Sequence, residues 1–108
     1  MQDQQKPIEW VGSTKQDLRD LPREAIQRVG YQLELVQDGD EPSSWKPMPS
    51  VGAGVCEIRI KCDDGAFRVF YVANLPDAIY ILHVFRKTTE KTEKRDIDLG
   101  KARFKSLG

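Results

Sequence analysis

The chain has 108 residues, of which 39% are hydrophobic and 31% are charged, a composition typical of a globular protein. This length suits one domain, because hydrophobic cores split only in much longer chains. No apolar stretch approaches the roughly 20 residues of a membrane-spanning helix, and residues 1–10 lack the apolar core of a secretory signal. We therefore expect a single domain over residues 1–108, located in the cytoplasm and without membrane contact.

The formal net charge is zero, but the charges are unevenly distributed along the chain. Residues 1–45 hold five basic and nine acidic groups, a balance of −4, whereas residues 86–108 hold eight basic and four acidic groups, a balance of +4. The overall charge therefore says little about partners. The local field of the C-terminal cations, by contrast, favours a phosphate-bearing ligand.

The first third of the chain is predicted to form a short strand followed by two helices. Residues 7–11 are partly apolar and β-branched, as a short strand requires. Ser13 followed by Gln16 resembles a capping box and predicts a short helix that ends near Asp20. Pro22 suits the first position of a second helix. An apolar stripe at helical spacing should face the core, namely Ile26, Val29, Leu33 and Val36.

Two glycines carry structural information in this region. Gly39 is expected to terminate the second helix. Gly30 lies inside it and costs about 1 kcal/mol relative to alanine, so we interpret it as the mark of a close helix contact. Residues 38–54 then hold three of the six prolines and show no periodicity, which predicts a loop long enough to carry function.

Three strands of a meander follow this loop. Apolar and polar residues alternate over residues 55–62, 67–73 and 78–86, with turn signals between them. Thr92 is then expected to cap a final helix. The predicted order is β-α-α-β-β-β-α, an α+β domain with a small, twisted, mainly antiparallel sheet and with helices packed on one face.

The two cysteines are predicted to be unbridged, buried thiols. Cys56 and Cys62 lie six residues apart on the same face of one predicted strand, which separates them by about 20 Å. A disulfide requires Cα atoms within roughly 7 Å. The chain has one histidine and no C-x-x-C motif, so we expect no metal site and no cofactor.

Arginines on two neighbouring strands are the strongest candidates for chemistry. Alternation allows Arg59 and Arg68 to share the face without cysteines, where the C-terminal cations and Lys46 would close the rim of a shallow groove. Arginine stays charged and presents a planar fork, which suits it to hold a phosphate and to stabilise charge that develops there. The alternative is that Arg59 pairs with Glu57 or a cross-strand acid and has no catalytic role.

The sequence does not identify which residues would act as general base and general acid. His83 is the only histidine, so catalysis by a pair of histidines is excluded. His83 either faces the core as a buried imidazole or takes part in catalysis, and alternation alone does not decide between the two. Otherwise a lysine must act as the base, which requires its pKa to fall by about 3 units from about 10.4. Neighbouring cations lower a lysine pKa, which is one reason to cluster them.

Two segments resemble a known superfamily. They are Phe-Arg-Val-Phe-Tyr at residues 67–71 and Leu-His-Val-Phe-Arg-Lys-Thr at residues 82–88. With the order of elements, they make the chain similar to the RelE/ParE toxin superfamily, in its phage-derived, HigB-like branch. The resemblance implies a small twisted sheet with two N-terminal helices on one face.

The same resemblance implies a function and two partners. Such proteins are toxins of type II toxin–antitoxin systems and act as ribosome-dependent mRNA endoribonucleases. They cut mRNA in the ribosomal A site by attack of the ribose 2′-OH, which leaves a cyclic phosphate, and they need no metal. The second partner is a cognate antitoxin, often with a helix-turn-helix domain and encoded next to the toxin.

The resemblance also implies roles for individual side chains. Arg68 matches the strand arginine that contacts the scissile phosphate, and Arg86 and Lys87 match the basic pair after the last strand. The implied catalytic set is Arg68, Arg86, Lys87 and His83, and the implied RNA-binding set is Lys46, Arg59, Lys91, Lys94 and Arg95.

Two other functions remain open at this point. The ParE side of the superfamily inhibits DNA gyrase with the same fold. A toxin that has lost its activity would only bind its antitoxin. The process that stops first in the cell distinguishes mRNA cleavage, which stops protein synthesis, from gyrase inhibition, which stops DNA replication.

Overall fold

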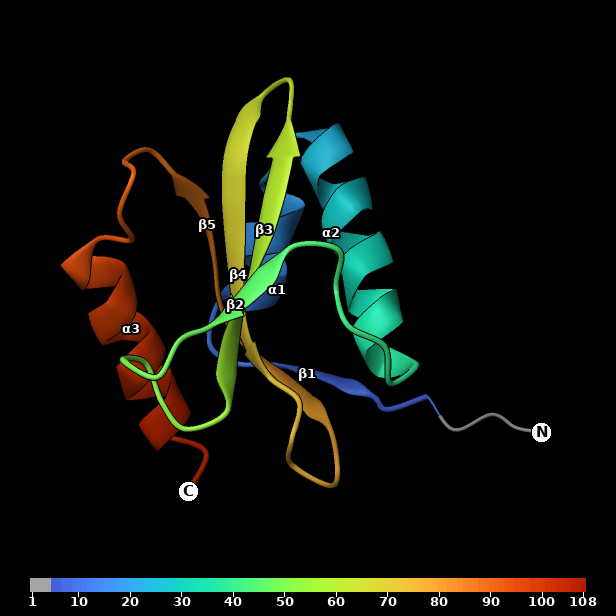
Figure 1. Cartoon of the computed structure of the whole chain (residues 1–108), viewed down its shortest axis with the longest axis vertical. Helices are drawn as coiled ribbons and strands as arrows, with labels where there is room; N and C mark the ends of the chain where they lie inside the picture. Colours follow the sequence, from blue (N-terminus) through green and yellow to red (C-terminus); the bar gives the residue numbers. More distant parts are fainter. Residues whose placement is uncertain (1–4) are drawn as a thin grey trace.

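A computed structural model describes residues 5–108 and shows a five-stranded sheet between helices (Figure 1). The expected order of elements is confirmed, with one additional short strand, β2, inside the long loop. The elements are β1 (Ile8–Trp10), α1 (Thr14–Arg19), α2 (Arg23–Gln37), β2 (Trp45–Pro47), β3 (Val55–Cys62), β4 (Gly65–Val72), β5 (Ile79–Lys87) and α3 (Lys94–Lys105). The strand order is β1-β5-β4-β3-β2, in which only β1 and β5 pair in parallel.

The predictions about helix ends and helix packing are confirmed in part. Gly39 follows α2 with a φ of +88° and donates to the carbonyl of Val36 at 3.0 Å, which ends the helix as expected. Ser13 precedes α1, but its hydroxyl donates to Asp17 and makes no cap bond. The interpretation of Gly30 was wrong, because a Cβ there would meet nothing within 4 Å. Within residues 5–108, no helix combines the length and apolar character needed to cross a bilayer.

One face of the sheet packs against α1 and α2. The apolar stripe of α2 meets alternate residues of β3, β4 and β5, and both cysteines lie at this face, half-buried and unbridged. We call it the α2 face. The buried residues of its core are Ala25, Val29, Leu33, Val36, Ile58, Ile60, Phe67, Val69, Tyr71, Ile79, Ile81 and Val84.

The final helix covers the opposite face, which we call the α3 face. Phe70, Leu82 and Phe85 from the sheet pack there with Met48 and Val51 of the long loop. Ile97 and Phe104 of α3 and Leu107 beyond it complete this second core. Figure 1 shows α2 and α3 on opposite sides of the sheet. The fold therefore differs from the expectation that all helices pack on one face, because α3 has apolar residues of its own to bury.

A β-bulge in β5 decides which side chains reach each face. Phe70 pairs with His83 and Tyr71 pairs with Ile81, so Leu82 has no partner in β4. Leu82 and His83 consequently both face α3, and every later residue of β5 lies on the face opposite to the one that simple alternation predicts.

Candidate functional site

A buried carboxylate lies at the centre of the cations on the α3 face. Glu57 of β3 is fully buried, and its Oε1 lies 3.7 Å from Arg68 Nε, 3.9 Å from Arg59 Nε and 4.0 Å from Lys46 Nζ. These distances exceed those of hydrogen bonds. Within the described part of the chain, Oε1 of Glu57 and Nε of Arg68 are buried without a hydrogen-bond partner.

The strand register brings the two arginines together. Arg59 and Arg68 are direct cross-strand partners in the β3–β4 hairpin, so they share one face, as alternation predicted. The sequence pattern offered Glu57 only as an alternative partner for Arg59. In the structure Glu57 contacts both arginines and Lys46, so the carboxylate belongs to the cation cluster.

The cations of this cluster are unequally exposed. The Arg68 side chain is 15% exposed and donates to the carbonyl of Phe67 at 3.0 Å, whereas Arg59 and Lys46 are 46% and 42% exposed. Burial lowers the pKa of Arg68, while the Glu57 charge acts in the opposite direction. Arg68 is thus anchored at the sheet, and the other two can move.

The bulge separates the basic pair at the end of β5. Lys87 lies opposite Ala66 on the face of Arg68, and its ammonium donates to the carbonyl of Glu90 at 2.6 Å. Burial lowers the pKa of Lys87, and the charge of Arg68 lowers this pKa further. Arg86 instead lies on the α2 face, 4.7 Å from the centre of the Phe67 ring. The structure therefore places Lys87 beside the cluster and Arg86 on the other side of the sheet.

The loop after β5 is tied to the cluster by Thr92, which the sequence pattern predicted to cap the final helix. That prediction was wrong, because the residue before α3 is Glu93 and no side chain of the described residues caps the helix. Thr92 donates from its hydroxyl to Oε2 of Glu57 at 3.0 Å. Within residues 5–108, the three remaining predicted RNA-binding residues form no hydrogen bond or ion pair with Glu57, and they lie exposed on this loop and α3. Lys94 pairs with Asp98 at 2.7 Å, Arg95 pairs with Glu93 at 3.1 Å, and Lys91 is exposed.

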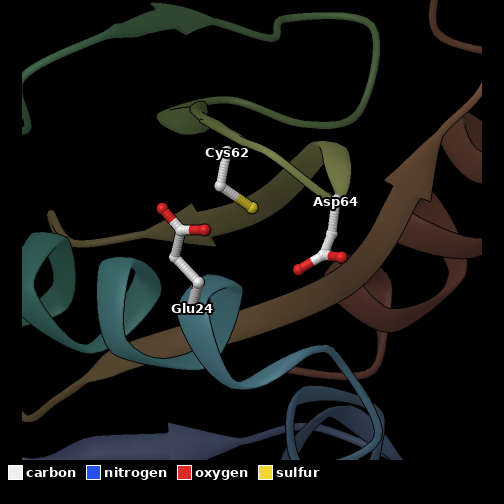
Figure 2. A group of neighbouring side chains, drawn as sticks. All are labelled: Glu24, Cys62 and Asp64. Carbon is white, nitrogen blue, oxygen red and sulfur yellow. The ribbon is translucent and has the colours of Figure 1, made fainter.

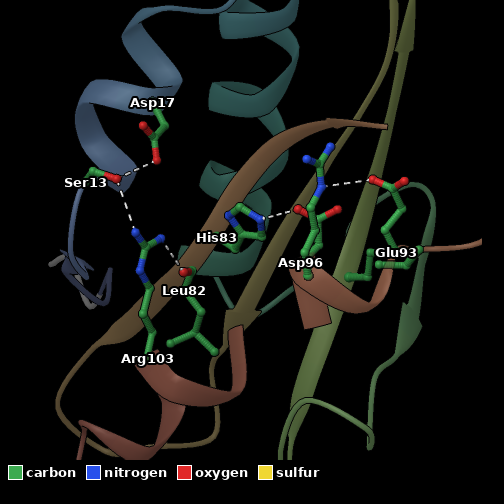
Figure 3. Close-up of polar contacts among 10 residues, drawn as sticks. Ser13, Asp17, Leu82, His83, Glu93, Asp96 and Arg103 are labelled. Carbon is green, nitrogen blue, oxygen red and sulfur yellow. Dashed lines mark hydrogen bonds and ion pairs between the residues drawn. The ribbon is translucent and has the colours of Figure 1, made fainter. Parts of the chain in front are cut away.

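The histidine lies beneath α3, as Figure 3 shows. His83 Nε2 is 2.8 Å from an oxygen of Asp96, and its ring stacks on Phe85 at 4.3 Å and meets the edge of Phe70. Burial lowers the pKa of His83, while Asp96 acts in the opposite direction. The structure thus gives the buried alternative for His83, with a role in holding α3 on the sheet.

A second polar anchor holds the other end of α3 (Figure 3). Arg103 donates to the carbonyl of Leu82 at 3.0 Å and to the hydroxyl of Ser13 at 3.2 Å, and Ser13 in turn donates to Asp17 at 2.8 Å. The carbonyl of Leu82 belongs to the bulge. The bulge therefore supplies an acceptor for α3 as well as the change of face in β5.

A shallow hollow opens beside Arg68. It has a volume of about 300 Å³ and is lined by Ser44, Arg59, Ile60, Lys61, Ala66 and Arg68. The hollow brings two arginines and one lysine to a surface where an anionic group can enter.

A separate group of possible metal ligands lies near the β3–β4 turn. The ligand atoms of Glu24, Cys62 and Asp64 all lie within 4.8 Å of one another (Figure 2). The spacing of these residues in the sequence did not indicate this neighbourhood. We assign no metal site to it, because Arg28 already donates two hydrogen bonds to the Glu24 carboxylate and Asp64 is exposed.

The chain matches the model of a known protein family. Residues 16–105 match the model of a family described as phage derived protein Gp49-like (DUF891). A search of curated proteins finds no match. The matched range includes every element from the middle of α1 to the end of α3 and all residues of the Glu57 cluster.

Proposed function

Because the chain belongs to the Gp49-like family of phage-derived proteins, a HigB-like branch of the RelE/ParE toxin superfamily, we propose that it cleaves mRNA on the ribosome. Its partners are then the mRNA in the ribosomal A site and a cognate antitoxin. The family supplies the reaction class, and the residues of the α3 face supply the chemistry.

The observation that carries this proposal is the excess of positive charge around Glu57. Lys46, Arg59, Arg68 and Lys87 contribute four positive charges and Glu57 one negative charge, a balance of +3 (4 − 1). A site of this charge beside an open hollow attracts the phosphates of a nucleic acid.

We assign the phosphate to Arg68. Its guanidinium is anchored by the carbonyl of Phe67, and its side chain lines the open hollow. Arginine holds its charge at all physiological pH values. Arg68 therefore binds the scissile phosphate and stabilises the extra negative charge that forms on it during attack.

We assign the proton acceptor to Glu57. Arg59 and Lys46 cover its Oε1 from about 4 Å without hydrogen bonds, and both are partly exposed. They can swing outward onto neighbouring phosphates and uncover the carboxylate. Glu57 then accepts the proton of the ribose 2′-OH as the 2′ oxygen forms a bond to phosphorus.

We assign the proton donor to Lys87. As the bond between phosphorus and the 5′ oxygen breaks, that oxygen needs a proton. Burial and the charge of Arg68 lower the pKa of Lys87, which makes its ammonium a stronger acid than a free lysine. The products are a 2′,3′-cyclic phosphate and a 5′-hydroxyl, and the proton taken by Glu57 balances the one given by Lys87.

A pulse of expression in cells, followed by mapping of the 5′ ends of cellular RNA, tests the function. The wild type should arrest growth and produce cuts in phase with reading frames. Arg68→Ala should lose both effects, whereas Arg19→Ala, which removes an exposed arginine of α1, should retain them. Normal translation in cells that contain abundant folded wild-type protein contradicts the proposal, and a DNA-damage response without RNA cuts indicates gyrase as the target.

Glu57→Gln separates the catalytic assignment from the function. The amide keeps the shape and the acceptor for Thr92 but does not take up a proton. We expect cleavage to fall by about 10² to 10⁴ while RNA binding persists. Cleavage at the wild-type rate removes Glu57 from the mechanism and leaves the reaction class intact.

A further inference from the structure

The free edge of β3 joins two hollows on opposite faces of the sheet. Strand β2 pairs only with residues 56–58, and the amide of Arg59 makes one more bond, to the carbonyl of Ser44. Beyond Arg59, β3 has no strand on that side, since β2 is the last in the sheet order. A ligand can therefore pass around this edge from the α3 face to the α2 face.

A cationic path follows the edge. The hollow beside Arg68, described above, and a second hollow of about 660 Å³ between α2 and β3 share Arg59, Ile60 and Lys61. Arg59 also contacts Glu57, so the path begins at the proposed cleavage site. Figure 1 shows α2 alongside β3, and residues of both elements line the second hollow.

The second hollow contains an exposed aromatic ring. Tyr31 of α2 is 59% exposed, and within residues 5–108 the only other exposed large hydrophobic residue is Leu99, at 38%. Arg28, Arg59 and Lys61 line the same hollow against the single acid Glu24, a balance of +2 (3 − 1). The core does not use this ring, so the packing of the fold does not explain it.

The polar wall of this hollow is ordered. Gln32 donates to the hydroxyl of Ser43 at 3.1 Å and accepts from its amide at 2.7 Å, which fixes the start of the long loop beside Tyr31. Proteins that bind single-stranded nucleic acids combine such a preformed, positively charged groove with an aromatic ring on which a base stacks.

We propose that Tyr31 stacks a base of the bound RNA, at a nucleotide beyond the two that flank the cleaved bond, while Arg59 and Lys61 hold the phosphates in between. This inference rests on the proposed function, since it places a further nucleotide of the same substrate. It makes α2, which lies on the other face of the sheet from Arg68, a part of the substrate-binding surface.

Two RNA probes of different length test the inference. They are a dinucleotide and a hexanucleotide, both fluorescently labelled and 2′-O-methylated so that neither can be cleaved. The hexanucleotide is chosen to span from Arg68 around the edge to Tyr31, and the dinucleotide to occupy the site beside Arg68 alone. Binding is measured by fluorescence anisotropy at low salt for the wild type, Tyr31→Ala, Tyr31→Phe and Arg68→Ala.

We expect Tyr31→Ala to weaken binding of the hexanucleotide about tenfold and to leave binding of the dinucleotide unchanged. Tyr31→Phe should bind both probes like the wild type, because the ring is kept. Arg68→Ala should weaken both. Because Tyr31 is exposed, we expect Tyr31→Ala to fold like the wild type. An unchanged melting temperature of this variant would show that its weaker binding does not come from unfolding.

The contrary outcomes separate the two proposals. Wild-type affinity of Tyr31→Ala for the hexanucleotide overturns the stacking inference alone, provided that Arg68→Ala still weakens binding. Equal losses in Tyr31→Ala and Tyr31→Phe also overturn it, since the hydroxyl and not the ring would then make the contact. No effect of Arg68→Ala on either probe, or no binding by the wild type, removes the proposed RNA site and the stacking inference with it.

Discussion

The two faces of the sheet use the same strands for opposite purposes. On the α2 face, Phe67, Val69 and Tyr71 of β4 pack into a continuous apolar core. The alternate residues of β4 face α3 and are of two kinds. Phe70 and Val72 are apolar and belong to the core under α3, whereas Arg68 lies outside that core, beside Glu57. Apolar packing occupies the α2 face and the part of the α3 face that α3 covers, whereas charge occupies the uncovered part of the α3 face.

This division explains how a small protein stays folded with a buried carboxylate surrounded by cations. The α2 face alone buries twelve residues in its core, which supports the fold without help from the charged cluster. The cluster is also electrostatically frustrated, because its cations outnumber its one acid and make no hydrogen bonds with Glu57 Oε1. A phosphate that enters the site relieves this excess of positive charge.

The largest expected effect compares neighbouring residues of β4 that face opposite ways. Phe67→Ala removes a fully buried ring and should lower the free energy of unfolding by about 3–5 kcal/mol. Arg68→Ala should lower it less, by about 0.5–3 kcal/mol, because Arg59 and Lys46 still balance the charge of Glu57. Urea unfolding of both variants measures the difference.

The RNA readout should reverse that ranking. Arg68→Ala should abolish RNA cleavage while the protein stays folded, whereas any loss of activity in Phe67→Ala should follow its folded fraction. A larger loss of stability in Arg68→Ala than in Phe67→Ala would show that the charged cluster, and not the apolar core, carries the fold.

The next effect concerns the contact of α3 with its face. A Cβ added at Gly100 would lie 2.8 Å from Phe70 and 3.0 Å from Val51, so Gly100→Ala should push α3 away from the sheet. We expect a loss of about 1–3 kcal/mol in the free energy of unfolding, measured by thermal or urea unfolding.

Gly30→Ala is the matched control for this prediction. Gly30 also lies inside a helix but has open space around its Cα, so the same substitution should stabilise the protein by about 1 kcal/mol. Stabilisation of both variants would mean that α3 can shift without cost and that its packing is loose.

A smaller effect is expected at the loop that touches the cluster. Thr92→Val keeps the shape of the side chain but removes the hydrogen bond to the buried Glu57, which should cost about 1–2 kcal/mol. Thr89→Val removes a hydroxyl whose partner, the carbonyl of Lys91, lies in an exposed part of the same loop. This control should change stability little, and equal losses in the two variants would indicate that Thr92 gains nothing from Glu57.

The last prediction concerns pH and the α3 face. Burial lowers the pKa of His83 below its ordinary value of about 6.5, so the unfolded chain takes up a proton at higher pH than the folded one. The contribution of His83 to stability is therefore complete above pH 6.5 and decreases as the pH falls toward the folded-state pKa. Urea unfolding between pH 8 and pH 5 should show this decrease, and His83→Gln should flatten it. An unchanged slope in His83→Gln would assign the pH dependence to other groups.

Regular stretches of the fold could be predicted from local pattern. Alternation placed Arg59 and Arg68 on one face because β3 and β4 form a hairpin with unbroken register from Val55 to Val72. The same reasoning failed beyond Ile81, because one unpaired residue at the bulge exchanges the faces. Lys87 therefore reaches the cluster and Arg86 does not, although they are adjacent in the chain.

Contacts between distant segments had no signature in the sequence. Thr92 reaches Glu57 across 35 positions, and Tyr31 shares a hollow with Arg59 because α2 packs beside the open edge of β3. Thr92 stood out in the sequence only as a helix cap, and Tyr31 did not stand out by type or spacing. Glu57 could have been found, since alternation puts it on the face of Arg59 and the register then brings it near Arg68.

The resemblance of two segments indicated the family. Local pattern predicted the order of the helices and of every strand except β2, and it separated the apolar from the charged set of strand residues. These properties follow from periodicity and residue type, which act over a few neighbouring positions. Three features became visible in the folded chain alone: α3 covers the second face, cations enclose Glu57, and Arg86 lies apart from Lys87. These outcomes depend on a one-residue change of register and on the path of loops, which tertiary packing selects and local sequence does not encode.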